Sequence, residues 1–245
     1  MFPALCLALS KKEKDMQSSR KLVALLTVMV AILALAPVSA AQARSPQPYV
    51  YPPQSHPYGH SYSEWLIRSI RSGMAIPMPQ NPELDHTGAR CAVGQSGPVW
   101  YLGGNLGGTD IRTCTVPAGK ALLIGGAGAF AATVVGGGDT FAALRSRAKS
   151  GMDGVTEDEV TVDGVHLTNL LTRYRFQTLL FTLAYPADNF MGVPGPGTTK
   201  AVADCTQVIL APLAAGRHTV DLRFAYGPPM NPMAGHVTYH LTIRR

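Results

Sequence analysis

The chain has 245 residues and a formal net charge of +6, and 46% of its residues are hydrophobic while 15% are charged. Residues 1–43 hold five of the 21 basic and two of the 15 acidic residues, so a chain without them carries 16 basic and 13 acidic residues, or +3. No Lys/Arg cluster with interleaved aromatic residues remains beyond that point, so we predict no nucleic-acid partner.

The first 43 residues have the order of a secretory signal peptide. Five basic residues precede the uncharged apolar run Leu22–Ala36, and small residues follow it. We expect cleavage after Ala40 or Ala43, with either Met1 or Met16 as the start. An uncleaved anchor is the alternative, but the run is shorter than the about 20 residues that a spanning helix needs. The sequence thus predicts a secreted or periplasmic protein with no membrane span after cleavage.

Residues 44–62 are rich in Pro, Tyr, Ser and His, and they predict a flexible, extended leader before a single domain over residues 63–245. His56 and His60 could bind copper or zinc, but two histidines provide few ligands, and binding would have to order a flexible segment at a large cost in conformational entropy. We therefore predict a plain linker, with no metal and no other cofactor.

The domain opens with a predicted helix, Glu64–Ser72, which Ser63 can cap and Gly73 can end. Its apolar positions include Trp65. The simpler interpretation is that Trp65 anchors the helix to the core, and the alternative is that the ring stacks on a glycan.

A cysteine-bearing stretch from Asn81 to Leu123 is the most informative part of the chain. Val99–Leu102 predicts a strand, the glycines at 103–108 a turn, and Ile111–Val116 a returning strand. Cys91 and Cys114 flank this predicted hairpin. In an oxidising compartment they are expected to form a disulfide worth roughly 3 kcal/mol.

The same stretch resembles a family of uncharacterised secreted bacterial proteins. The resemblance is carried by Asn81-Pro82, Asp85, Thr87-Gly88, Cys91, Gly94-Gln95, Gly97 to Leu102, Gly107-Gly108, Arg112, Cys114 and Val116 to Leu122, and it continues after Met152. It implies export but no established activity. Cys205 departs from the pattern, and Gly128 to Gly138 is richer in glycine.

Two features of the middle of the chain leave alternatives open. Cys205 is the odd cysteine once Cys6 leaves with the signal peptide, and a buried inert thiol is expected, against an intermolecular bridge or a reactive thiol. Ala121–Gly138 predicts a buried strand and then a loop. A dinucleotide-binding turn at Gly126 and Gly128 and a membrane-inserting segment are the alternatives, and the later glycines oppose both.

The second half of the domain is mainly β in pattern. After a predicted helix from Asp139 to Ser150, strands are expected on both sides of an Asp163-Gly164 turn, and four more follow to the end. These four are Leu179–Tyr185, Val202–Leu213, His218–Phe224 and His236–Ile243. The fold class is therefore mainly β, an antiparallel β-sandwich or jelly roll with one or two short helices.

No catalytic motif stands out. His218, Asp204 and Arg112 are weak candidates for catalysis, and Trp100, Tyr101 and Trp65 are weak candidates for ligand binding. His236 and His240 lie four apart on a predicted strand, some 13 Å from each other, too far to share a metal.

We therefore predict a non-catalytic exported module that binds an envelope or extracellular glycan or protein. The alternatives are a hydrolase of envelope polymer and a structural surface protein that self-assembles through strand edges or Cys205, and the sequence does not choose among oligomeric states.

Overall fold

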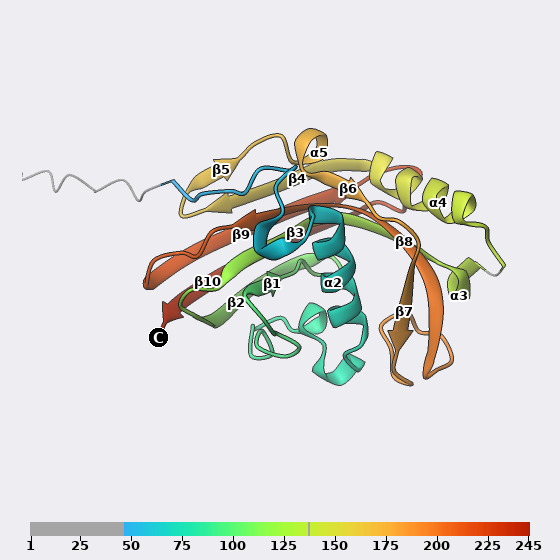
Figure 1. The fold of residues 1–245 in the computed structure, drawn as a ribbon, viewed down its shortest axis with the longest axis horizontal. Coiled ribbons are helices and arrows are strands. Elements are labelled where there is room, and N and C mark those ends of the chain that lie inside the picture. The colour runs from blue at the N-terminus through green and yellow to red at the C-terminus, as the bar shows by residue number, and fades with distance from the viewer. Residues whose placement is uncertain (1–46, 137) are drawn as a thin grey trace, which may run out of the picture. The chain divides into compact units, whose positions relative to one another are not determined.

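The computed structural model describes residues 47–136 and 138–245, which form two five-stranded β-sheets and several short helices (Figure 1). The predicted mainly-β sandwich with short helices is confirmed. The predicted signal peptide and Cys6 lie outside the described residues. Among these residues, no helix is both long enough and apolar enough to span a membrane.

The first sheet is built around β8, the longest strand. In space its order is β1–β3–β8–β6, and β7 pairs with another part of β8. The bounds are β1 Val99–Leu102, β3 Ala121–Ala132, β6 Arg175–Gln177, β7 Phe181–Tyr185 and β8 Gly197–Leu210. Nearly every residue of β8 from Ala201 onward is buried, as expected of the central strand predicted at 202–213.

The second sheet runs β2–β10–β9–β4–β5, and its strands alternate buried and exposed residues as a sheet with one solvent face must. The bounds are β2 Gly108–Pro117, β4 Val155–Val162, β5 Val165–Leu167, β9 Gly216–Tyr226 and β10 Met233–Arg244. The predicted hairpin at Asp163-Gly164 is confirmed, because Val162 pairs with Val165 and both turn residues have positive φ. Inward side chains of both sheets share the main core.

Two thirteen-residue helices cover opposite faces of β8. Helix α2, Tyr62–Met74, begins with a capping box at Ser61 and buries Leu66 against Ala201 and Ala203. Helix α4, Phe141–Asp153, begins at Thr140 and buries Leu144 and Ala148 against Val202. Both helices start within two residues of the predicted positions. The shorter elements are η1 Pro57–Gly59, η2 Met78–Gln80, η3 Pro82–Leu84, α3 Thr133–Gly136 and α5 Leu170–Arg173.

The described part of the predicted flexible leader, residues 47–62, is packed against the domain. Val50 forms a bridge with Leu210, and the Tyr51 N–H donates to Ile209 O at 2.9 Å. The Trp65 indole N–H also donates to Pro57 O at 2.8 Å. These contacts make the segment part of the domain in this structure.

The hairpin predicted from Val99 to Val116 is wrong. β1 pairs in parallel with β3 in the first sheet, whereas β2 pairs in parallel with β10 in the second. The burial patterns give the reason, because β1 is buried on both faces while β2 has one exposed face. The chain therefore crosses between sheets at the predicted turn.

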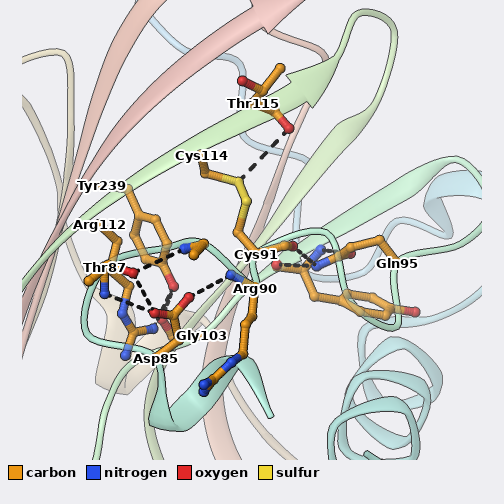
Figure 2. Close-up of a disulfide and its surroundings, with 12 residues drawn as sticks. Asp85, Thr87, Arg90, Cys91, Gln95, Gly103, Arg112, Cys114, Thr115 and Tyr239 are labelled. Atoms are coloured by element: carbon orange, nitrogen blue, oxygen red, sulfur yellow. Dashed lines mark hydrogen bonds between the residues drawn. A yellow bond between two sulfur atoms is a disulfide. The ribbon is translucent and has the colours of Figure 1, made fainter. Parts of the chain in front are cut away.

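The predicted disulfide is confirmed. Cys91 is bonded to Cys114, with the Cα atoms 5.9 Å apart, and it holds the loop after η3 against β2 (Figure 2). The Thr113 N–H also donates to Thr87 O at 2.8 Å. In the same loop Asp85 accepts from the N–H groups of Thr87 and Arg90. Although burial acts to raise its pKa, these hydrogen bonds lower it to about 2.

Two glycines of β3, Gly126 and Gly128, make room for other groups. A side chain at Gly126 would meet Asp158 Oδ1 at 2.5 Å, and one at Gly128 would meet Cys205 Sγ at 2.9 Å. At Gly125 a Cβ atom would meet only Leu102 O, at 3.9 Å, which is an ordinary van der Waals contact. The glycine-rich part of the strand is thus explained by packing, with a local bulge between Gly125 and Gly128.

Replacing both Cys91 and Cys114 by alanine is expected to lower the free energy of unfolding by about 3 kcal/mol, because the unfolded chain loses a cross-link across 23 residues. Urea unfolding under oxidising conditions measures the change, with Cys205→Ala as the matched control. An unchanged urea midpoint would show that the bond contributes no stability.

Asp158→Asn is expected to make the protein more stable than the native chain at neutral pH. Burial raises the pKa of Asp158, against hydrogen bonds from Thr206 and the Ala127 N–H. The folded state therefore binds this proton more tightly than the unfolded state does, and the native chain loses stability as pH rises above about 4.

Urea unfolding of both chains between pH 4 and pH 8 tests this. Their difference should grow toward neutral pH, by about 1.4 kcal/mol for each unit by which the folded pKa exceeds the unfolded one. A difference that stays constant with pH would contradict the assignment.

Candidate functional site

A cavity of about 230 Å³, partly open to solvent, lies beside the C-terminal half of α2. We call it the α2 cavity. Its walls come from α2, η3, the loop that carries Cys91, strands β1 and β3, and the buried faces of β2 and β10. Most of the walls are apolar, and the polar groups come mainly from two places, η3 and the inner side of β2 and β10.

Arg112 is the charged residue in the inner wall, and its side chain is 2% exposed. Its Nη2 atom donates to Asp110 Oδ2 at 2.9 Å, and its Nη1 atom donates to the Tyr239 hydroxyl at 2.9 Å. The carbonyls of Gly104 and Glu83 accept further hydrogen bonds. Because Asp110 is ionised and equally buried, the guanidinium charge is neutralised within the protein.

Tyr239 links this ion pair to the end of β1. Its hydroxyl donates to Gly103 O at 2.8 Å while it accepts from Arg112 (Figure 2). Burial raises the pKa of Tyr239 to about 12, although the neighbouring Arg112 acts to lower it. The hydroxyl therefore stays protonated and holds the connection between β1 and β2 in place.

Glu83 brings a carboxyl group to the cavity from η3. Asn81 fixes the start of this turn, because its Oδ1 atom accepts from the Glu83 N–H at 3.0 Å. The carboxyl lies against Gly103, where a Cβ atom would collide with it. Within residues 47–136 and 138–245 it has no hydrogen-bond partner, and burial raises its pKa while Arg112 opposes the rise.

The amide side chains of the cavity are, by contrast, occupied by the protein itself. Asn81 Nδ2 donates to the carbonyls of Gly73 and Ile76. Gln95 Nε2 donates to Tyr101 O at 2.9 Å, and Gln95 Oε1 accepts from the Tyr101 N–H at 2.8 Å. These groups shape the walls and leave little capacity for a ligand.

The three predicted catalytic candidates lie apart in the hydrogen-bond network. Arg112 lines the α2 cavity, whereas Asp204 pairs with Arg175, Nε to Oδ1 at 2.8 Å, at the first sheet. His218 lies on β9, where Nδ1 meets Asp163 Oδ2 at 2.6 Å and Nε2 meets Ala214 O at 2.9 Å. Both nitrogens of His218 are therefore engaged by the hairpin turn and its surroundings.

Of the three aromatic residues predicted to bind a ligand, only one lines the cavity. Trp65 and Trp100 are 3% and 7% exposed, so neither offers a ring face to a glycan in this structure. Tyr101 is half-buried and lines the α2 cavity. The tryptophans are thus core residues, and Tyr101 remains a binding candidate.

The structure also shows the surroundings of the residues considered for a metal site and for a reactive thiol. Across the described ranges, no three His, Cys, Asp or Glu side chains gather as metal ligands. Burial, with a contribution from Asp204, raises the pKa of Cys205 to about 12. A thiol that stays protonated at neutral pH is a poor nucleophile.

No protein-family model matches the chain, and no curated protein matches it in sequence. Among solved structures, the cysteine protease inhibitor EhICP2 from Entamoeba histolytica is similar at a TM-score of 0.24 and 13% identity, over 60% of this chain and 96% of that one. The structure of PbICP-C in complex with falcipain-2 is similar at a TM-score of 0.25 and 14% identity, over 60% of this chain and 99% of that one. Amebosin is similar at a TM-score of 0.19 and 12% identity, over 60% of this chain and all of that one. Likenesses this weak carry no argument about function.

Tyr239→Phe is expected to lower the free energy of unfolding by about 1–3 kcal/mol, because it removes the donor to the partly buried Gly103 carbonyl and an acceptor from the buried Arg112. Urea unfolding measures the loss. Tyr49→Phe is the control, since Tyr49 is 60% exposed. Equal stability of the two variants would remove Tyr239 from this role.

Proposed function

We propose that this protein is a non-catalytic binding module that works outside the cytoplasm, with the α2 cavity as its binding site. The observation that carries the proposal is the Glu83 carboxyl, which has no hydrogen-bond partner among the described residues and lies at the wall of a mainly apolar cavity. Ligand sites have this character, with apolar walls and a few polar groups that fix orientation.

Export is supported by the order of residues 1–43 and by the disulfide. A disulfide between Cys91 and Cys114 fits an oxidising compartment, such as the periplasm or the cell exterior. The partner is then an envelope or extracellular component.

The cavity walls favour a protein or a small apolar molecule over a glycan. A sugar ring carries hydroxyls on every side, and each needs a hydrogen-bond partner once it leaves water. The amides of Asn81 and Gln95 are already engaged, and Trp65 and Trp100 are buried. A mainly apolar group with a single polar end fits this site better.

Gly125→Leu should abolish binding in the cavity. Gly125 and Leu123 both line the cavity from the same face of β3, and a Cβ atom at Gly125 would meet Leu102 O at 3.9 Å, an ordinary van der Waals contact. A leucine there is therefore expected to extend into the cavity and occupy it. Gly125→Ala adds one methyl group and serves as the control.

The measurement is the shift of amide NMR signals of the purified, ¹⁵N-labelled protein on titration with benzylamine, benzyl alcohol, benzoate and N-acetylglucosamine. We expect at least one benzyl compound to shift signals around the cavity in the native chain and in Gly125→Ala, and to shift none there in Gly125→Leu. Shifts that survive in Gly125→Leu, or none with any compound, would overturn the proposal.

A further inference from the structure

Glu83 defines the chemistry that the α2 cavity can recognise. We propose that the ligand is a primary ammonium group on an apolar stem, and that the Glu83 carboxylate receives the ammonium while the apolar walls hold the stem. This inference rests on the proposed function, and it names the class of ligand.

The first step of the argument is accessibility. Four described side-chain atoms are buried and unpaired, and they include Arg112 Nε and Trp100 Nε1 but neither oxygen of Glu83. Since the Glu83 carboxyl also lacks a hydrogen-bond partner, its oxygens must be open to the cavity. A ligand can therefore reach Glu83, whereas the free nitrogen of Arg112 is covered.

The second step is charge. The guanidinium of Arg112 is neutralised by Asp110, and its Nη atoms already donate to the protein. Glu83 is the acidic residue of the cavity walls, and no lysine lines them. Burial raises the pKa of Glu83 and so disfavours its charge, and a positively charged donor offsets that cost because it both donates hydrogen bonds to the carboxylate and neutralises it.

The third step is size. An apolar cavity of 150 Å³ in another protein holds benzene, so about 230 Å³ admits a six-membered ring with one or two further atoms. It equally admits the four methylene groups and the ammonium of a lysine side chain. The wall residues Ile70, Met74 and Leu123 supply the apolar contact for such a stem.

This chemistry has two sources, a free organic amine or a lysine side chain of a protein. In both, a strongly hydrated ammonium gives up water in exchange for a carboxylate. A neutral alcohol of the same shape can donate a hydrogen bond to Glu83 but leaves its negative charge without a counter-ion, and an anionic ligand would be repelled by that charge.

The test compares benzylamine with benzyl alcohol, which have nearly the same shape, on the native chain, on Glu83→Gln and on Glu159→Gln. Glu159 is an exposed acid of β4 and controls for a general loss of charge. Because burial disfavours the Glu83 charge, Glu83→Gln is expected to be at least as stable as the native chain, and urea unfolding verifies this.

We expect the native chain and Glu159→Gln to bind benzylamine about tenfold or more tightly than benzyl alcohol, from NMR or calorimetric titration. Glu83→Gln should abolish this preference and leave the binding of benzyl alcohol unchanged. Equal binding of the two compounds by the native chain would overturn the amine assignment and leave the proposed function standing. A preference that survives in Glu83→Gln would also overturn it.

Nα-acetyl-lysine-N-methylamide separates the two sources. Binding that depends on Glu83 would assign the site to lysine side chains of a protein partner. Binding of benzylamine without binding of the lysine derivative would assign it to free amines. Failure of every compound, charged or neutral, would remove the cavity as a binding site and would overturn the proposed function with it.

Discussion

The burial of one positive charge constrains this domain more than any other interaction. Arg112 lies inside the protein, so its guanidinium must be surrounded by acceptors that the fold itself supplies. Asp110 comes from the same strand, Tyr239 from β10, and the carbonyls of Glu83 and Gly104 from η3 and the β1–β2 connection. Four segments, the most distant of them 127 residues from Arg112 in the sequence, thereby meet at one point, and the α2 cavity lies beside it.

The elements that could be predicted from the sequence are those whose signals are local. The Asp163-Gly164 hairpin needs only two turn residues and alternation on each side, and β8 needs only a long apolar run. The Val99–Val116 hairpin failed because its glycines also suit a crossing between sheets. Only the partner strand of β2 distinguishes a hairpin from a crossing. That partner is β10, which brings Tyr239 beside Arg112 although the two are 127 residues apart, so no local signal could reveal it.

The candidate site was predictable only in part, for a related reason. Arg112 and Tyr101 belong to the pattern that carries the family resemblance, and both line the cavity. Glu83 falls between the residues of that pattern, in a three-residue turn with no periodicity to reveal it. The burial of Trp65 agrees with the core role preferred for it from the sequence, whereas the burial of Trp100 could not be predicted, since residue type alone does not tell whether an aromatic ring is exposed or buried.

The parallel pairing of β2 with β10 also bears on the order in which the protein assembles. β10 lies inside the second sheet, between β2 and β9, yet it follows both in the chain. Contacts between residues this far apart in the sequence form slowly, because the entropy of closing a long loop is lost before the strand pairing can offset it. Until β10 arrives, β2 and β9 each have an unpaired edge that can bind another chain. If the chain is exported as proposed, it must be held unfolded, and away from other copies, until its last strand has crossed the membrane.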